Sequence, residues 1–406
     1  MQSLKARYIF PVSSDPIPDG VISLDAGRIV AVGTEPVAGA GLQDLGNVAI
    51  LPGFVNSHTH LDLTGVGKPL GKPGIAFVDW IRKVIEFRLS EPQGDSVERG
   101  LRESLRHGTT TLADIVQVGW SADRIEESGI DVTAFLELRG PTKERIPTAM
   151  ENARRHLEAA KTSTAWRPGL CPHAPYSVHP RLFAGPIVLS AVEHIPLSFH
   201  LAESQEEIEL LREGTGPLRE LLEELDAWEE GLITANARPL DYLRALPAYR
   251  TLIIHGNYLD DEEIEFLGGW ADRMSVVYCP RTHAHFAHDP YPLEKMLSVG
   301  VNVALGTDSR ASSPDLSVLA EMRCVARRFP AIDRDVILRM GTLHGARALG
   351  RDQEIGTLEP GKLADLAVAA LPNRDAGDPH ELLLHSDEPV TSTFLSRRHG
   401  DAFDGN

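Results

Sequence analysis

Short apolar segments alternate with stretches rich in Glu, Leu, Arg and Ala through most of this 406-residue chain. Each apolar run has the length of a strand, and each stretch between two runs can form a helix with one apolar face. This alternation is typical of β/α units, in which helices join parallel strands. Eight such runs predict a closed (β/α)8 barrel. The runs lie at residues 53–58, 109–115, 133–138, 168–172, 196–200, 251–255, 275–279 and 301–306.

The two ends of the chain carry a different pattern. Before residue 51, short alternating segments such as 28–32 are separated by prolines and glycines, which indicates strands and turns. After Gly350 the sequence returns to β-type segments, including 364–369. We therefore predict the α/β class: a TIM barrel over residues 52–350, with residues 1–51 and 351–406 paired into a small composite β-sandwich.

Composition limits the partners of the protein. Its formal net charge of -18 and its lack of a long basic run argue against binding to nucleic acid. The three cysteines are far apart, so neither a disulfide framework nor a thiolate zinc site is expected. No window approaches the roughly 20 apolar residues of a membrane span. We expect a cytoplasmic protein with a small-molecule substrate and no membrane partner; a homodimer is left open.

Candidate metal ligands stand at the ends of predicted strands, where barrel enzymes place their active sites. His58 and His60 alternate along one strand, so both rings face the same side and can reach one ion. His200 ends the fifth run and Asp308 closes the eighth. Three imidazoles and one carboxylate suit Zn²⁺ or Fe²⁺, with one position left for water. We predict one divalent metal ion, with zinc preferred and iron as the alternative.

The order of the motifs resembles the amidohydrolase superfamily. Its H-x-H, H-L-A-E, H-G and G-T-D elements begin here at His58, His200, His255 and Gly306. The H-L-A-E element is closest to the deaminase and chlorohydrolase branch of that superfamily. Segments 344–350 and 356–366 resemble the exit from the barrel and the return strand of the sandwich, so the resemblance covers nearly the whole chain.

The resemblance implies a role for each of these residues. The metal ligands would be His58, His60, His200 and Asp308. Glu203 would shuttle a proton to the substrate ring, and His255 would orient and polarise the attacking water. A bound metal lowers the pKa of its water to about 7, and Asp308 would accept the proton of that water. Binuclear relatives bridge two ions with a lysine or a glutamate at the fourth strand; residues 170–176 contain neither, so one ion is expected.

For each residue predicted to contact the substrate, a purely structural role is the alternative. The resemblance suggests that His173 hydrogen-bonds the substrate, although a structural role in a proline-flanked turn is open. Arg139, Arg281 and Arg310 each follow a predicted strand end, where they suit a substrate carboxylate or rim salt bridges. Trp80 would pack under the ring pocket or in the core.

Two further segments have alternative interpretations. His283, His285 and His288 have spacing compatible with a second metal, but we prefer contact between the substrate and one of them, taken as His285. The Glu/Leu-rich stretch 206–230 is predicted to form an outer-layer helix pair with a solvated acidic face.

The leading hypothesis is a metal-dependent aminohydrolase that removes the amino group of a purine-like or nucleoside-like heterocycle and releases ammonia. Segments 279–283 and 305–309 also resemble the aminodeoxyfutalosine deaminases. One alternative is hydrolysis without deamination, such as dechlorination of a triazine or ring opening of an imidazolone or another cyclic amide. A metal-free scaffold or binding protein would be expected to have lost ligands, and none is lost in this sequence.

Overall fold

The computed structural model describes residues 1–90, 95–246 and 249–396. All eight predicted runs form strands, and these strands lie parallel in one sheet that follows chain order. The prediction of a (β/α)8 barrel is thus confirmed. The strands are β8 (Phe54–Thr59), β9 (Thr109–Val116), β10 (Asp131–Leu138), β11 (Trp166–Pro172), β12 (Pro196–Leu201), β13 (Arg250–His255), β14 (Met274–Tyr278) and β15 (Asn302–Leu305).

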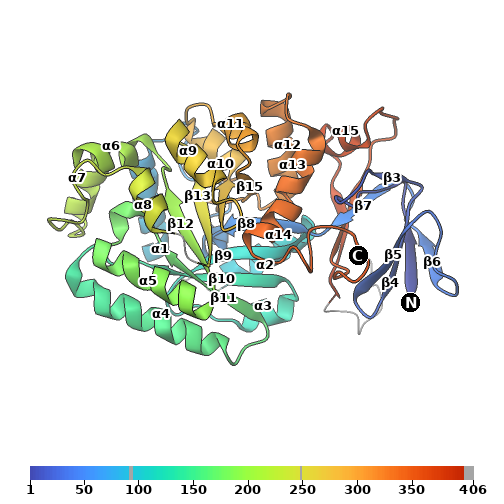
Figure 1. Cartoon of the computed structure of the whole chain (residues 1–406), viewed down its shortest axis with the longest axis horizontal. Helices are drawn as coiled ribbons and strands as arrows, with labels where there is room; N and C mark the ends of the chain where they lie inside the picture. Colours follow the sequence, from blue (N-terminus) through green and yellow to red (C-terminus); the bar gives the residue numbers. More distant parts are fainter. Residues whose placement is uncertain (91–94, 247–248, 397–406) are drawn as a thin grey trace.

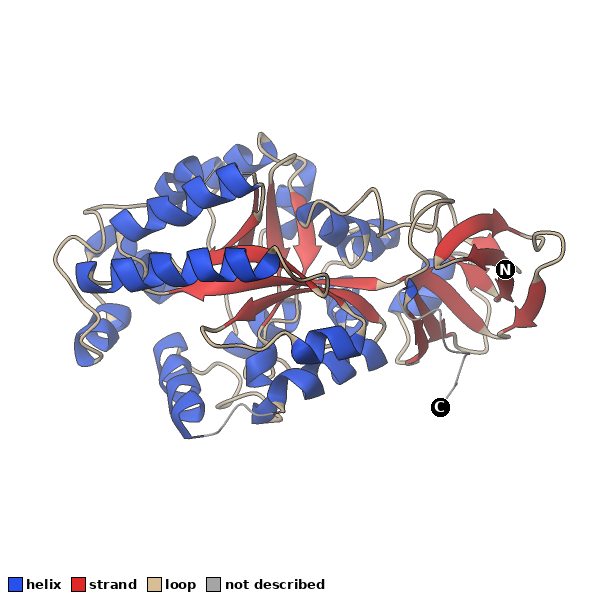
Figure 2. Cartoon of the chain, turned by 90° about the horizontal axis from the view of Figure 1, so that it is seen from below, coloured by secondary structure: helices blue, strands red, loops and turns tan. Residues whose placement is uncertain are grey.

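The barrel closes where its first and last strands meet. Thr59 forms an isolated parallel bridge with Asp308, and the carbonyl of His58 accepts hydrogen bonds from the backbone N–H groups of Thr307 (3.1 Å) and Asp308 (3.0 Å). Every residue of β9 and β10 is buried, as expected for strands covered on both faces. The strands occupy the centre and the helices surround them (Figure 2).

Helices follow the strands around the outside of the barrel (Figure 1). The stretch predicted as a helix pair forms α6 and α7, which are separated by a turn in which Gly214 and Gly216 have φ of 70° and 95°. The helices are α1 (Phe77–Ser90), α2 (Ser96–Arg106), α3 (Asp123–Ser128), α4 (Ile146–Ala160), α5 (Pro180–Glu193), α6 (Gln205–Glu213), α7 (Pro217–Glu224), α8 (Pro239–Ala245), α9 (Asp261–Gly268), α10 (Pro280–Phe286), α11 (Leu293–Ser298), α12 (Val318–Arg328), α13 (Arg334–Met340), α14 (Leu343–Ala348) and α15 (Pro379–Leu384).

The two chain ends form two further sheets beside the barrel, at the right of Figure 1. One has the order β5-β4-β1-β6 and the other β17-β16-β7-β2-β3. Because β16 pairs antiparallel with β7, the composite origin of this part is confirmed; residues 397–406 lie outside the described residues. The strands are β1 (Gln2–Lys5), β2 (Tyr8–Ile9), β3 (Ile17–Pro18), β4 (Val21–Asp25), β5 (Arg28–Gly33), β6 (Gly41–Asp44), β7 (Val48–Pro52), β16 (Leu366–Ala370) and β17 (Val390–Phe394).

Both chain ends contribute to the core of this β-rich part. Leu4, Ile22 and Ile50 pack with Leu366 and Val368 in a single buried cluster. The three cysteines are free and buried. No helix in the described part of the chain is long and apolar enough to cross a membrane.

Candidate active site

Three histidines converge at the carboxyl ends of two barrel strands. His58 lies in β8, His60 directly follows that strand, and His200 lies in β12. Each offers a ring nitrogen within 4.8 Å of the nitrogens of the other two. All three are buried. Both ring nitrogens of His58 and Nδ1 of His60 have no hydrogen-bond partner among the described residues. Unpaired buried nitrogens are costly, so this cluster has the donor atoms and the unmet bonding capacity that fit a cation.

Asp308 lies against this cluster. Its Oδ1 atom is 3.7 Å from Nε2 of His58 and 3.8 Å from Nε2 of His60, while Oδ2 accepts a hydrogen bond from the Ser312 hydroxyl at 2.8 Å. Burial raises the pKa of Asp308 to about 6. One carboxylate oxygen is thus fixed and the other faces the histidines.

The hydrogen bond at the far side of His200 orients its ring. Nδ1 of His200 lies 3.1 Å from the backbone carbonyl of His173, so the protonated Nδ1 donates and Nε2 is left to face the cluster. Such a partner for the second ring nitrogen is the usual way in which a metal-binding histidine is held.

Glu203 and His255 form a buried pair beside the histidine cluster. Oε1 of Glu203 is 3.2 Å from Nε2 of His255, and the backbone carbonyl of Glu203 accepts a hydrogen bond from the Asn257 amide at 2.8 Å. Burial raises the pKa of Glu203 well above its usual value and lowers the pKa of His255. This environment favours the neutral forms of both the carboxyl group and the imidazole.

A second glutamate, which sequence reasoning missed, holds the turn that carries Glu203. The carboxylate of Glu207 accepts hydrogen bonds from the backbone N–H groups of Ala202 (3.0 Å) and Glu203 (2.8 Å). Ala202 has a φ of 53°, a conformation that is strained for a residue other than glycine. A signal for Glu207 was present, because Ser204 followed three residues later by Glu is a helix-capping pattern.

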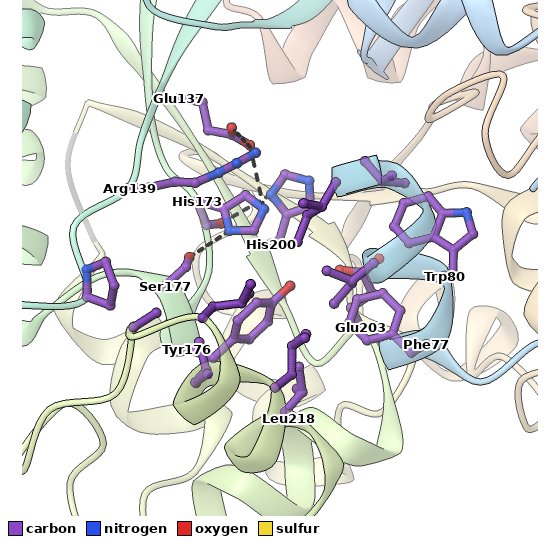
Figure 3. Close-up of a pocket in the computed structure, with 18 of the residues that line it drawn as sticks. Phe77, Trp80, Glu137, Arg139, His173, Tyr176, Ser177, His200, Glu203 and Leu218 are labelled. Carbon is purple, nitrogen blue, oxygen red and sulfur yellow. Dashed lines mark hydrogen bonds and ion pairs between the residues drawn. The ribbon is translucent and has the colours of Figure 1, made fainter. Parts of the chain in front are cut away.

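A cavity of about 360 Å³ opens over these groups. Of the predicted substrate-binding residues, His173, Arg139 and Trp80 line it. Nδ1 of His173 lies 2.6 Å from the Ser177 hydroxyl, and Arg139 forms an ion pair with Glu137 (Figure 3). Burial raises the pKa of Glu137, but the nearby groups Arg139, His173 and Arg88 together outweigh this effect, and the pKa falls below its usual value.

The other predicted substrate-binding residues do not line this cavity. Arg281 pairs with Glu321 (2.6 Å) and Asp315 (2.8 Å), and Arg310 pairs with Glu103 at 2.8 Å. These are the structural salt bridges that the sequence left open for the arginines. Nε2 of His285 lies 3.0 Å from the carbonyl of Leu70, so this histidine fastens the segment that precedes α1.

The predicted histidine cluster in 283–288 does not gather around one point. Nδ1 of His283 is 3.3 Å from the Arg328 guanidinium, and Nδ1 of His288 is 2.9 Å from the Tyr258 hydroxyl. Among the described residues, the group with the geometry of a metal site is His58, His60 and His200. We therefore do not assign a second ion to His283, His285 and His288.

Replacement of Arg281 by Ala is expected to lower the free energy of unfolding by about 3–5 kcal/mol, because it leaves the fully buried carboxylate of Glu321 without its cation. Urea denaturation measures this loss. In Arg102→Ala, which removes an exposed pair within α2, the change should stay below about 0.5 kcal/mol. If Arg281→Ala instead had normal stability and a raised KM, Arg281 would be a substrate-binding residue.

The barrel, the buried histidine cluster and the carboxylates at its mouth define the class of the protein, a metal-dependent barrel hydrolase. Within that class the chain belongs to the amidohydrolase family: the family model described as "Amidohydrolase family" matches residues 49–398. This family binds a divalent metal ion, and His58, His60 and His200 form the candidate site for it.

Two relatives and one solved structure are similar along most of their length. The 5-methylthioadenosine/S-adenosylhomocysteine deaminase of Moorella thermoacetica is 30% identical over 97% of this chain and 90% of its own. The aminodeoxyfutalosine deaminase of Deinococcus radiodurans is 29% identical over 80% of this chain and 81% of its own. The aminofutalosine deaminase of Helicobacter pylori in complex with methylthio-coformycin has a TM-score of 0.85 at 22% identity, covering 98% and 99% of the two chains.

Proposed function

We propose that this protein is a metal-dependent deaminase that replaces the exocyclic amino group of an adenine-like ring with oxygen and releases ammonia. The observation that carries the proposal is the meeting of three buried histidines, Asp308 and the Glu203–His255 pair at one end of the barrel. The relatives, which are named as deaminases of adenine-containing compounds, support it.

Buried nitrogens of His58 and His60 without hydrogen-bond partners point to the proposed metal site. His58, His60 and His200 would supply imidazole nitrogens, and Asp308 would supply the carboxylate oxygen that faces them. A set of three imidazoles and one carboxylate suits zinc, with iron as the alternative. When bound, the cation supplies Lewis acidity, which lowers the pKa of water and generates a nucleophile at neutral pH.

Two carboxyl groups would move the protons. Asp308, whose pKa lies at about 6, accepts a proton from the attacking water. Glu203, whose pKa is raised by burial, would donate a proton to the ring nitrogen next to the reacting carbon. His255 lies 3.2 Å from Glu203, and its neutral ring can hold the water in line with that carbon. Positioned acids and bases of this kind contribute about 10²–10⁴-fold to rate.

The reaction balances with water as the second substrate. The water oxygen forms a bond to the ring carbon, and the bond between that carbon and the amino nitrogen breaks. One water proton passes by way of Asp308 to the amino group, which leaves as ammonia. The other passes to Glu203 as the new oxygen becomes an oxo group, and it replaces the proton that Glu203 gave to the ring nitrogen. The product is therefore the oxo form of the heterocycle.

His173 and Trp80 would bind the ring itself. The His173 imidazole lies between Ser177 and Glu137 at the side of the pocket, and Trp80 lies across from it (Figure 3). We propose a polar contact of the ring with His173 and an apolar contact with Trp80. Arg139 lines the pocket too, but its pair with Glu137 leaves it a weaker candidate for a substrate carboxylate.

The protein is further proposed to work in the cytoplasm. Its three buried, unpaired cysteines are compatible with a reducing compartment.

Ammonia release by the metal-loaded protein tests the proposed function. We expect release from 5′-methylthioadenosine or aminodeoxyfutalosine, and none from guanine, cytosine or triazines. Coupled glutamate dehydrogenase and the shift in ultraviolet absorbance would follow the reaction independently. Absence of ammonia from the whole panel, with metal confirmed in the protein, would contradict deamination. Turnover of chlorinated triazines or imidazolones would then place the protein among the hydrolases that do not deaminate.

A further inference from the structure

The turn after β12 places the side chain of Glu203 in the cavity (Figure 3), and the backbone of this turn is bonded on both sides. On its N–H side, the carboxylate of Glu207 accepts hydrogen bonds from Ala202 at 3.0 Å and from Glu203 at 2.8 Å. On its carbonyl side, the side-chain amide of Asn257 donates to the carbonyl of Glu203 at 2.8 Å. The backbone N–H of Tyr258 donates to the carbonyl of Ala202 at 3.1 Å. We call the side chains of Glu207 and Asn257 the turn clamp.

The turn clamp holds a backbone conformation that is unfavourable by itself. Ala202 has a φ of 53°, and His255, at the end of the neighbouring strand β13, has a φ of 70°. Residues other than glycine adopt this left-handed region at a cost and keep it only where surrounding bonds fix it. Glu207 supplies two of those bonds, so the turn depends on a side chain that comes from the following helix.

A comparison with α9 shows that Glu207 does more than cap its own helix. In a capping box, the glutamate at the third helical position accepts from the backbone N–H of the N-cap residue. The helix α9 follows this rule, because Glu263 accepts from its N-cap, Asp260, at 2.8 Å. The N-cap of α6 is Ser204, yet the carboxylate of Glu207 bonds the two residues before it. This carboxylate therefore serves the turn that carries Glu203.

The turn clamp stands behind the reacting groups. Glu207 is fully buried, Asn257 is 6% exposed, and neither residue lines the cavity. Any effect of these side chains on the reaction must therefore pass through the residues that do line it, of which Glu203 is the one they bond. A misplacement of about 1 Å in a reacting group can lower a rate by 10²-fold.

We propose that Glu207 is a positioning residue for proton transfer, which holds the turn that keeps the carboxyl group of Glu203 beside His255 and at the reacting ring. Asn257 acts from the other side of the same turn. This inference rests on the proposed deaminase function, in which Glu203 delivers the proton, and it adds the residues that fix the place of this proton donor.

Glu207→Gln tests the proposal, because glutamine keeps the shape of the side chain but has one oxygen for two N–H groups. We expect kcat for ammonia release to fall by about 10- to 100-fold. The KM should stay within about twofold and the metal content should not change, because the loss concerns the transition state alone. Burial raises the pKa of Glu207 to about 7, so assays above that pH compare the variant with an ionised wild-type carboxylate.

Asn257→Ala is the second test, and it removes the bond on the opposite side of the turn. It should lower kcat in the same way, again with little change in KM or metal content. In the double variant the loss should be smaller than the product of the two single losses, because residues that act through one shared element are not additive.

The matched control is Glu263→Gln. Glu263 is also a buried glutamate at the third position of a helix, and it also accepts two backbone N–H groups, those of Asp260 at 2.8 Å and Leu240 at 3.1 Å. It does not line the cavity and has no bond to the turn of Glu203. Its replacement should reduce stability to a similar degree as Glu207→Gln and leave kcat unchanged.

Hydrogen–deuterium exchange adds a measurement that needs no substrate: the amides of Ala202 and Glu203 should exchange faster in Glu207→Gln than in the wild type. Unchanged kcat in both clamp variants would overturn the inference. A parallel loss of metal in Glu207→Gln, or an equal loss of kcat in Glu263→Gln, would also overturn it, because either result marks a purely structural role. Failure of the wild type to release ammonia would instead remove the proposed function, and the exchange data would still show whether Glu207 holds the turn.

Discussion

Replacement of Glu203 by Gln is expected to lower kcat for ammonia release by about 10²–10⁴-fold while leaving the metal content unchanged. Glutamine has the same shape and preserves the contact with His255, which lies 3.2 Å from the native carboxyl. It has no carboxyl proton to deliver, whereas burial raises the pKa of the native Glu203 and so favours the protonated carboxyl group. Steady-state assays of ammonia, together with elemental analysis of the purified variant, measure both quantities.

The matched control for this substitution is Glu206→Gln. Glu206 stands in the first turn of α6 and does not line the cavity, so we expect kcat to change by less than about twofold. Equal activity of the Glu203→Gln variant and the wild type would remove Glu203 from proton transfer. A parallel loss of metal and activity would show instead that the side chain supports the metal site.

The strands and their carboxyl-terminal residues could be predicted because both depend on local patterns. A buried parallel strand is a short continuous apolar run, and the barrel places the end of every strand at one mouth. His58, His200 and Asp308 were therefore expected near each other before their contacts were known. Their separation in the sequence did not matter, because chain order is also spatial order in this sheet.

Side chains beyond the strand ends were less predictable, because their roles depend on which partner tertiary packing supplies. Arg139 and Arg281 both follow a strand. Arg139 lines the cavity, whereas Arg281 turns to the buried carboxylate of Glu321, which comes from α12. Nothing local to Arg281 indicates that pairing.

The same limit applies to the stretch 206–230. It was predicted as an outer-layer helix pair, but Leu218 and Leu221 of its second helix, α7, also line the cavity. Its amphipathic pattern identifies an apolar face, but the pattern is identical whether that face covers the barrel or borders a ligand cavity. Which of the two it does depends on α1, because Phe77 and Trp80 of that helix line the cavity together with Leu218 and Leu221. A signal from α7 alone could not have located the cavity.

Removal of the metal is expected to abolish ammonia release and to lower the stability of the folded chain. Ligand nitrogens such as those of His58 and His60 are buried without hydrogen-bond partners, so the cation satisfies groups that otherwise destabilise the folded state. A ligand present at a thousand times its Kd stabilises the folded state by about 4 kcal/mol. Thermal denaturation before and after treatment with a chelator measures this difference, and added Zn²⁺ should restore both properties.

Two His→Asn variants locate the effect of the metal within the chain. His60→Asn should lose bound metal and ammonia release, because it removes one of the three converging imidazoles. His194→Asn is the control: His194 is exposed at the end of α5 with a φ of 54°, a conformation that asparagine tolerates. This variant should keep the metal and the activity of the wild type. Full metal content in His60→Asn would show that the ion does not bind at the histidine cluster. A site built on His58, His60 and His200 cannot lose a ligand without losing affinity.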